Sequence, residues 1–70
     1  MYTANMPMLN QTKVLSMNVH MLLSMINMKL RNEAHSLSGL CRTYALDENQ
    51  LVARLQQADY VYLSELNQFR

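Results

Sequence analysis

The 70-residue chain contains one cysteine, one glycine and one proline, and it has no tryptophan. A lone cysteine excludes a disulfide within the chain, and the apolar neighbours of Cys41 predict a small core residue rather than a nucleophile or ligand. A single reduced thiol is consistent with a cytoplasmic protein. No run of about 18 apolar residues occurs, and the first residues lack the pattern of a signal peptide, so no membrane partner is expected.

Charged and titratable groups are also scarce. The net charge of +1 does not indicate a nucleic-acid protein with a strongly basic face. Besides Cys41, the chain offers His20, His35 and five carboxylates, with no metal-ligand spacing and no glycine loop for phosphate. The sequence therefore predicts a protein that is not an enzyme and that has no metal site, cofactor or small-molecule ligand.

The short length points to association with another chain. A domain of this size buries only about 60% of its extended-chain surface, so its stability is marginal without additional support. A disulfide is excluded and half of the residues are apolar. Association with a second copy or with another protein is therefore the expected source of additional buried area.

Residues 36–60 predict two short helices joined by a tight turn. The first follows Ser36 as N-cap, and the second follows Asp47, which is expected to accept the N–H of Gln50 while Gln50 reaches back. Leu46 and Leu51 are expected to pack across this second cap. The apolar positions of the two helices are Leu37, Leu40, Cys41, Tyr44, Leu51, Val52, Leu55 and Ala58. With a small residue in the first helix and another in the turn, the pattern is typical of a helix-turn-helix pair.

The preceding residues predict one longer helix. Residues 1–17 are expected to form an irregular or partly ordered extension, since Pro7 and scattered polar residues favour irregular structure up to about residue 13. The helix should run from the N-cap Asn18 to about Asn32, although its pattern extends back to Val14. Residues 18–70 then form a single helix-turn-helix-like domain.

This longer helix has two apolar faces when residues are placed at steps of about 100°. One is aliphatic: Leu15, Val19, Leu22, Leu23, Ile26 and Leu30. The opposite one, here called the methionine face, consists of Met17, Met21, Met25 and Met28. The aliphatic face suits a packed core. The methionine face is either covered within the same chain or is a surface for a partner, because flexible thioethers suit both roles.

The final segment predicts a short hairpin that includes Tyr60 and Tyr62 and ends near Phe69, with Asn67 in a left-handed turn conformation. Its aromatic rings are expected to cap the core with their hydroxyls outward. The predicted fold class is thus mostly α, a three-helix helix-turn-helix-like bundle with a short C-terminal β-hairpin.

Two stretches, Met21–Cys41 and Leu51–Arg70, resemble a short bacterial family known as domain of unknown function four-two-five-zero. The family's strings are Leu-Leu-Ser, Asn-x-x-Leu-Arg, Ser-Leu-x-x-Leu-Cys and Tyr-x-Tyr followed by Asn-x-Phe. They match Leu22, Leu23, Ser24, Asn27, Leu30, Arg31, Ser36, Leu37, Leu40, Cys41, Tyr60, Tyr62, Asn67 and Phe69. The resemblance covers the chain from about Asn18 and implies a helical fold without a particular activity. Where the family tends to carry acidic residues after the cysteine, this chain has Arg42 and Thr43. Where the family tends to carry a glycine before the first tyrosine, this chain has Asp59.

Two functions are compatible with these patterns. In the preferred one, the chain is a small protein-interaction module that associates through the methionine face with itself or another protein. In the alternative, it is a dimeric DNA-binding regulator. The candidate base and phosphate contacts are then Asn49, Gln50, Arg54, Gln57, Arg42 and Lys29. Glu48 would repel the DNA backbone in that arrangement.

Asn27 and Arg31 lie four residues apart beside Ser24 on the polar side of the long helix. A structural role for Arg31, in which it bonds local carbonyls or Glu33 or packs on an aromatic ring, is favoured over a ligand-binding role.

Overall fold

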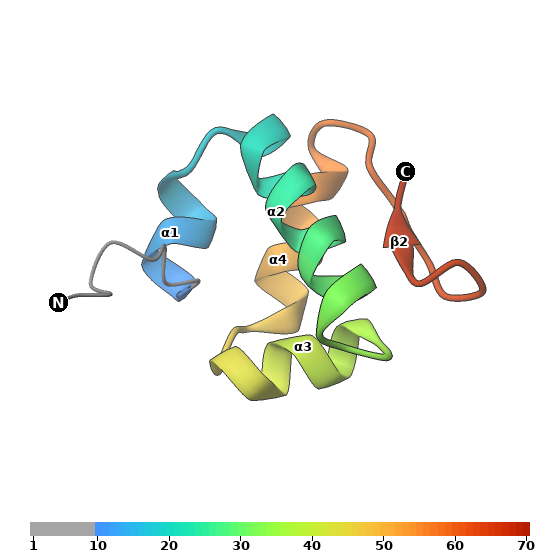
Figure 1. Ribbon diagram of the computed structural model, residues 1–70. Coiled ribbons are helices and arrows are strands. Elements are labelled where there is room, and N and C mark those ends of the chain that lie inside the picture. The colour runs from blue at the N-terminus through green and yellow to red at the C-terminus, as the bar shows by residue number, and fades with distance from the viewer. Residues whose placement is uncertain (1–9) are drawn as a thin grey trace, which may run out of the picture.

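In residues 10–70, four helices and a two-stranded hairpin make up the fold, which is mostly helical as predicted (Figure 1). The computed structural model describes residues 10–70, so the irregular structure expected for residues 1–9 lies outside the described part. The elements are α1 (Gln11–Ser16), α2 (Val19–Asn32), α3 (Leu37–Tyr44), α4 (Glu48–Gln56), β1 (Tyr62–Leu63) and β2 (Gln68–Phe69). The strands are antiparallel, with Tyr62 opposite Phe69.

Three side chains cap the longer helices at the predicted positions. Asn18 accepts the N–H groups of His20 and Met21, Ser36 accepts that of Gly39, and Asp47 accepts that of Gln50. Each cap binds a backbone donor that has no partner inside the helix. These starts are local features, and this is why the sequence alone located them.

The prediction of irregular structure up to about residue 13 is wrong for the described residues, because helix α1 begins at Gln11 after the N-cap Asn10. Packing stabilises this short helix, since the side chain of Val14 is fully buried. The predicted capping box at Asp47 is also wrong in one respect, because Gln11 takes the place of Gln50 in it. Gln11 Oε1 accepts the Asp47 N–H at 2.9 Å, and its Nε2 donates to Gln50, so Gln50 does not reach back to Asp47.

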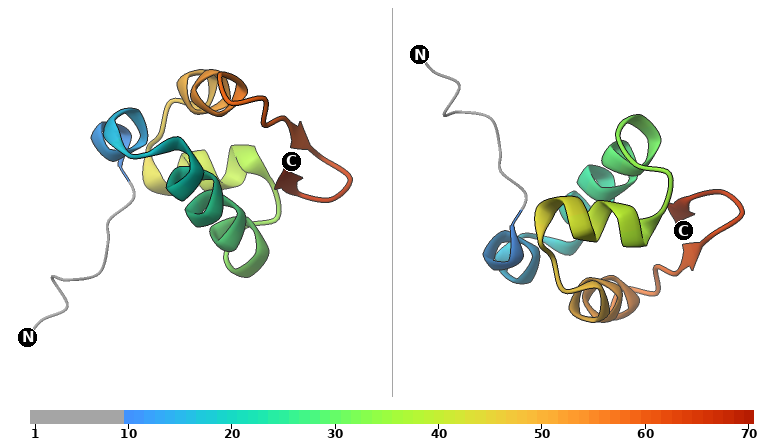
Figure 2. Two further views of the ribbon diagram at one scale, coloured as in Figure 1. Left: turned by 90° about the horizontal axis from the view of Figure 1, so that it is seen from above. Right: turned by 90° about the horizontal axis from the view of Figure 1, so that it is seen from below.

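The core lies where α2 crosses α3 and α4, with α1 and the hairpin on opposite sides (Figures 1 and 2). Its buried residues are Val14, Leu22, Ile26, Leu30, Leu37, Leu40, Cys41, Leu46, Leu51, Leu55 and Phe69. The predicted aliphatic face is therefore only partly correct. Val19 and Leu23 are half-buried, and Leu15 is 52% exposed because it belongs to α1, before the chain changes direction at Met17.

Helices α3 and α4 are joined by Ala45, Leu46 and Asp47, as the helix-turn-helix pattern predicted. Ala45 has a left-handed conformation with φ 56°, and the Leu46 N–H donates to the Cys41 carbonyl at 2.8 Å. This arrangement ends α3 and turns the chain into α4. Gly39 is not required by the helix crossing, since a Cβ atom there would meet only Ser36 Oγ, at 3.3 Å.

The hairpin is held against α2 by side-chain amides. Asn27 donates to the Phe69 carbonyl at 3.1 Å and accepts the Phe69 N–H at 2.8 Å, so its amide pairs with β2 as a neighbouring strand would. Asn67 is left-handed as predicted, with φ 52°. The outward orientation expected for the hydroxyls is wrong for Tyr62, which donates to Asn67 and accepts the Leu37 N–H.

Candidate functional site

Two residues of the methionine face are among the large apolar side chains that lie exposed in residues 10–70. Met21 and Met28 are 62% and 51% exposed, whereas Met25 is half-buried against the core. Met17 does not lie on α2, because it is the residue that ends α1. Three of the four predicted residues are therefore on α2, and two of them present their side chains to solvent.

Around these methionines lies a hollow of about 450 Å³, here called the α2 patch and lined by His20, Met21, Ser24, Met25 and Met28. It contains no lysine, arginine or carboxylate. His20 is fixed at its rim, since its Nδ1 lies 2.9 Å from the Tyr60 hydroxyl and the two rings meet edge to face. The patch thus combines three methionines with the polar residues His20 and Ser24, and protein-binding surfaces commonly combine apolar and polar side chains in this way.

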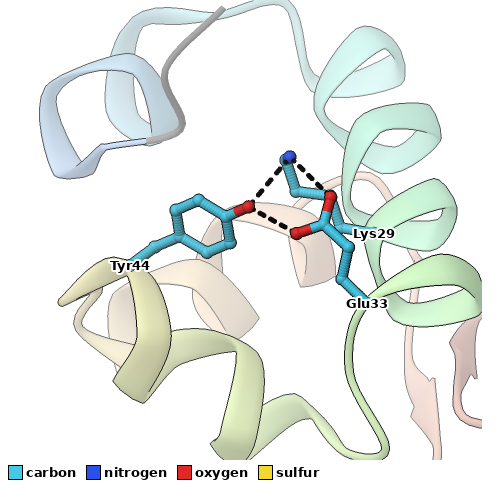
Figure 3. A network of polar contacts seen from close by, with 3 residues as sticks. All are labelled: Lys29, Glu33 and Tyr44. Atoms are coloured by element: carbon cyan, nitrogen blue, oxygen red, sulfur yellow. Dashed lines mark hydrogen bonds and ion pairs between the residues drawn. The ribbon is translucent and has the colours of Figure 1, made fainter.

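Lys29, one candidate phosphate contact, is bonded within the chain. Its Nζ donates to the Tyr44 hydroxyl at 3.1 Å and to Glu33 at 3.3 Å, while the Tyr44 hydroxyl donates to Glu33 (Figure 3). The hydrogen bond with Tyr44 is the main cause that raises the pKa of Lys29. The hydrogen bonds from Tyr44 and Lys29 lower the pKa of Glu33. This network joins the ends of α2 and α3.

Two further candidates are also engaged within the chain. Arg54 Nη2 donates to the Met17 carbonyl at 2.8 Å, and Gln50 accepts from Gln11. Arg42, Asn49 and Gln57 are exposed. Half of the predicted nucleic-acid contacts are therefore used to hold α1, α3 and α4 in place.

Asn27 and Arg31 line one cavity, whereas Ser24 lines the α2 patch. Asn27 binds β2, whereas Glu33, an expected partner of Arg31, is paired with Lys29. Arg31 is exposed, and the cavity that it lines with Asn27 lies between α2 and the hairpin turn, separate from the α2 patch. The sequence interpretation missed the roles of Asn27 and Asn67 in attaching the hairpin, although both positions belong to the family strings.

Burial, together with the smaller effect of the nearby Glu48 and Asp47 carboxylates, raises the pKa of the Cys41 thiol to about 11. The thiol therefore carries little negative charge at neutral pH, which makes it a poor nucleophile. Within residues 10–70, no three histidine, cysteine or carboxylate side chains are grouped as metal ligands. In that same range no helix has the length and apolar character needed to span a membrane.

The fold and these contacts define a small, mostly helical domain with a helix-turn-helix pair and a hairpin attached by amides. The chain belongs to the family described as Domain of unknown function (DUF4250), which matches residues 16–69. No match was found among curated proteins or among solved structures.

Proposed function

We propose that this domain is a non-catalytic protein-interaction module that forms a homodimer through the α2 patch. The observation that carries the proposal is the exposure of Met21 and Met28 on the long helix, away from the core. Thioether side chains are apolar and adaptable, so they suit a surface that becomes buried on association. The buried, reduced Cys41 supports a cytoplasmic location.

A second copy is the partner that the patch suits best. In a two-fold symmetric contact the same residues meet their own counterparts, so a charged patch would repel itself. The α2 patch contains no lysine, arginine or carboxylate, and pairing it with itself places no such charges together. A dimer would also add buried apolar area to a domain whose own core is small.

Sedimentation velocity of the wild type and of a Met21→Glu, Met28→Glu variant tests this proposal. The wild type should sediment as a dimer and the variant as a folded monomer, because the paired patches would bring four carboxylates together without partners. The matched control is Leu15→Glu, Val61→Glu, which adds the same charge at two apolar residues that are each 52% exposed outside the patch. The control should remain dimeric.

A wild-type protein that is monomeric at every concentration tested would contradict the proposal. Equal dissociation of the two charge variants would place the contact elsewhere. Circular dichroism of each variant separates loss of association from loss of folding.

DNA binding is the second candidate, favoured by the α3–turn–α4 geometry and the exposed Arg42, Asn49 and Gln57. Against it, α1 contacts the start of α4 through Gln11, and Asp47 and Glu48 place two carboxylates there. These carboxylates would repel phosphates. Duplex DNA of mixed sequence, added at low salt in the same sedimentation experiment, distinguishes the two functions. A salt-sensitive fast-sedimenting complex would favour DNA binding.

A further inference from the structure

A second hollow, separate from the α2 patch, lies between the end of α2 and the hairpin turn. Its volume is about 330 Å³, at the lower end of the range of small-molecule pockets. Its polar walls come from Asn27, Arg31 and His35 on one side and from Asn67 and Gln68 on the other. Leu66, which is 47% exposed, adds an apolar edge. The two hollows share no lining residue.

Side-chain hydrogen bonds between α2 and the hairpin hold residues that line this cavity. Asn27 binds both backbone groups of Phe69, and Asn67 Nδ2 donates to the carbonyls of Leu30 and Ala34 at 3.1 and 3.0 Å. The Asn67 Oδ1 also accepts from Tyr62. Because these hydrogen bonds form within the chain, the space between α2 and the hairpin is preformed and need not be opened by a ligand.

The side chains of Arg31 and His35 take no part in the hydrogen bonds that attach the hairpin. Arg31 and His35 line the cavity and are exposed, and no aspartate or glutamate is among its lining residues. In residues 10–70 the ion pair that forms is Lys29 with Glu33, so Arg31 has no carboxylate partner there. A guanidinium presents its donors in a planar fork that matches the two oxygens of a carboxylate.

We propose that this cavity binds the carboxylate of a small organic acid, with Arg31 holding the two oxygens and the remainder of the ligand lying against Leu66. His35 and the Gln68 amide supply further donors at the same opening. The proposal is independent of dimer formation, because a different set of residues carries it.

Arg31 also lies in the last turn of α2, where a cation is favoured by the helix dipole. If Arg31 has only that structural role, its substitution should lower the melting temperature, and the protein should bind no carboxylate at this cavity. The carboxylate site predicts a loss of binding with the melting temperature retained. Both quantities must therefore be measured on the same variants.

The test is an NMR titration of the full chain with sodium benzoate, and with benzamide as the uncharged ligand of the same shape. Benzoate should give saturable shifts of the Arg31 side-chain N–H and of the backbone amides of Leu66, Asn67 and Gln68, and benzamide should give none. Arg31→Gln should weaken binding by about tenfold or more, since hydrogen bonds between charged groups are stronger than those between neutral groups. The matched control, Arg42→Gln, removes an exposed cation elsewhere and should bind as the wild type does.

Four results would overturn the proposal. They are no saturable shift with benzoate, equal shifts with benzamide, equal shifts with inorganic phosphate, and unchanged benzoate affinity in Arg31→Gln. A lower melting temperature of Arg31→Gln with that unchanged affinity would assign the residue to the helix end alone.

Discussion

At the scale of single residues, three residues between positions 10 and 70 have a backbone conformation that normally favours glycine. Ala45, Asp59 and Asn67 have φ values of 56°, 68° and 52°. An L-residue loses about 1–2 kcal/mol in this conformation unless its side chain compensates. Asn67 compensates through its hydrogen bonds with Tyr62, Leu30 and Ala34, whereas a methyl group at Ala45 cannot.

Glycine substitution should therefore have opposite effects at two residues with the same conformation. Ala45→Gly should raise the free energy of unfolding by about 1 kcal/mol, because relief of the left-handed strain exceeds the added freedom of the unfolded chain. Asn67→Gly should lower it, because three side-chain hydrogen bonds of about 1 kcal/mol each are lost. Urea denaturation measures both. A change of the same sign in the two variants would contradict this account.

Residue roles were predictable where they depend on neighbours in the sequence. The left-handed conformation of Asn67 was expected from its turn, and the burial of Cys41 from its helical period. The pairing of Asn27 with Phe69 was not predictable, because the two residues are 42 positions apart. An asparagine in a helix does not indicate that its amide will bind a strand elsewhere in the sequence.

At the scale of elements, the contact between α2 and α3 includes the charged network of Lys29, Glu33 and Tyr44 (Figure 3). The Tyr44 hydroxyl is the main cause that lowers the pKa of Glu33 from its ordinary value of 4.5. A lowered carboxylate pKa stabilises the fold above that ordinary value. The contribution is lost as the pH falls through the pKa of the folded state.

Tyr44→Phe should raise the pKa of Glu33 toward 4.5 and lower the free energy of unfolding at neutral pH. The difference between wild type and variant should shrink in acid, where Glu33 is protonated in both. Carbon-detected NMR titration of the carboxyl group and urea denaturation at both pH values measure these effects. Tyr60→Phe is the control, since that hydroxyl contacts His20 and no carboxylate. An unchanged Glu33 pKa in Tyr44→Phe would exclude the proposed role.

The sequence predicted the longer helices from their N-cap residues. It did not predict the helix that is stabilised by contacts with residues far away in the sequence. The starts of α2, α3 and α4 follow from Asn18, Ser36 and Asp47. Helix α1 has six residues, too few to display a helical period, and Gln11 completes a cap 36 positions away. The hydrogen bond from Arg54 to the Met17 carbonyl likewise joins residues 37 positions apart, so the sequence did not reveal it.

At the scale of the whole molecule, one cluster of aliphatic side chains and Phe69 holds every element together. Leu40 and Leu55 lie in it almost without exposure. Leu40→Ala or Leu55→Ala should each lower the free energy of unfolding by about 2–5 kcal/mol, a large part of the stability of so small a domain. Gln57→Ala, at an exposed residue, should have almost no effect. If Leu40→Ala unfolded at the same urea midpoint as the wild type, Leu40 would not contribute to the core.

The two sides of α2 give the molecule its proposed function. Leu22, Ile26 and Leu30 complete the core, which leaves Met21 and Met28 on the outside. The sequence could separate these faces by their period. It could not locate the cavity beside Arg31, because that cavity exists only once Asn27 and Asn67 have attached the hairpin to α2.

The most direct measurement of self-association through α2 is an isotope-filtered NOE spectrum of chains labelled at the methionine methyl groups and mixed with unlabelled chains. The account predicts intermolecular NOEs from the methyl groups of Met21 and Met28, the exposed residues of the α2 patch. Intermolecular NOEs that arise only from another surface, or none under conditions where the two kinds of chain mix, would contradict it.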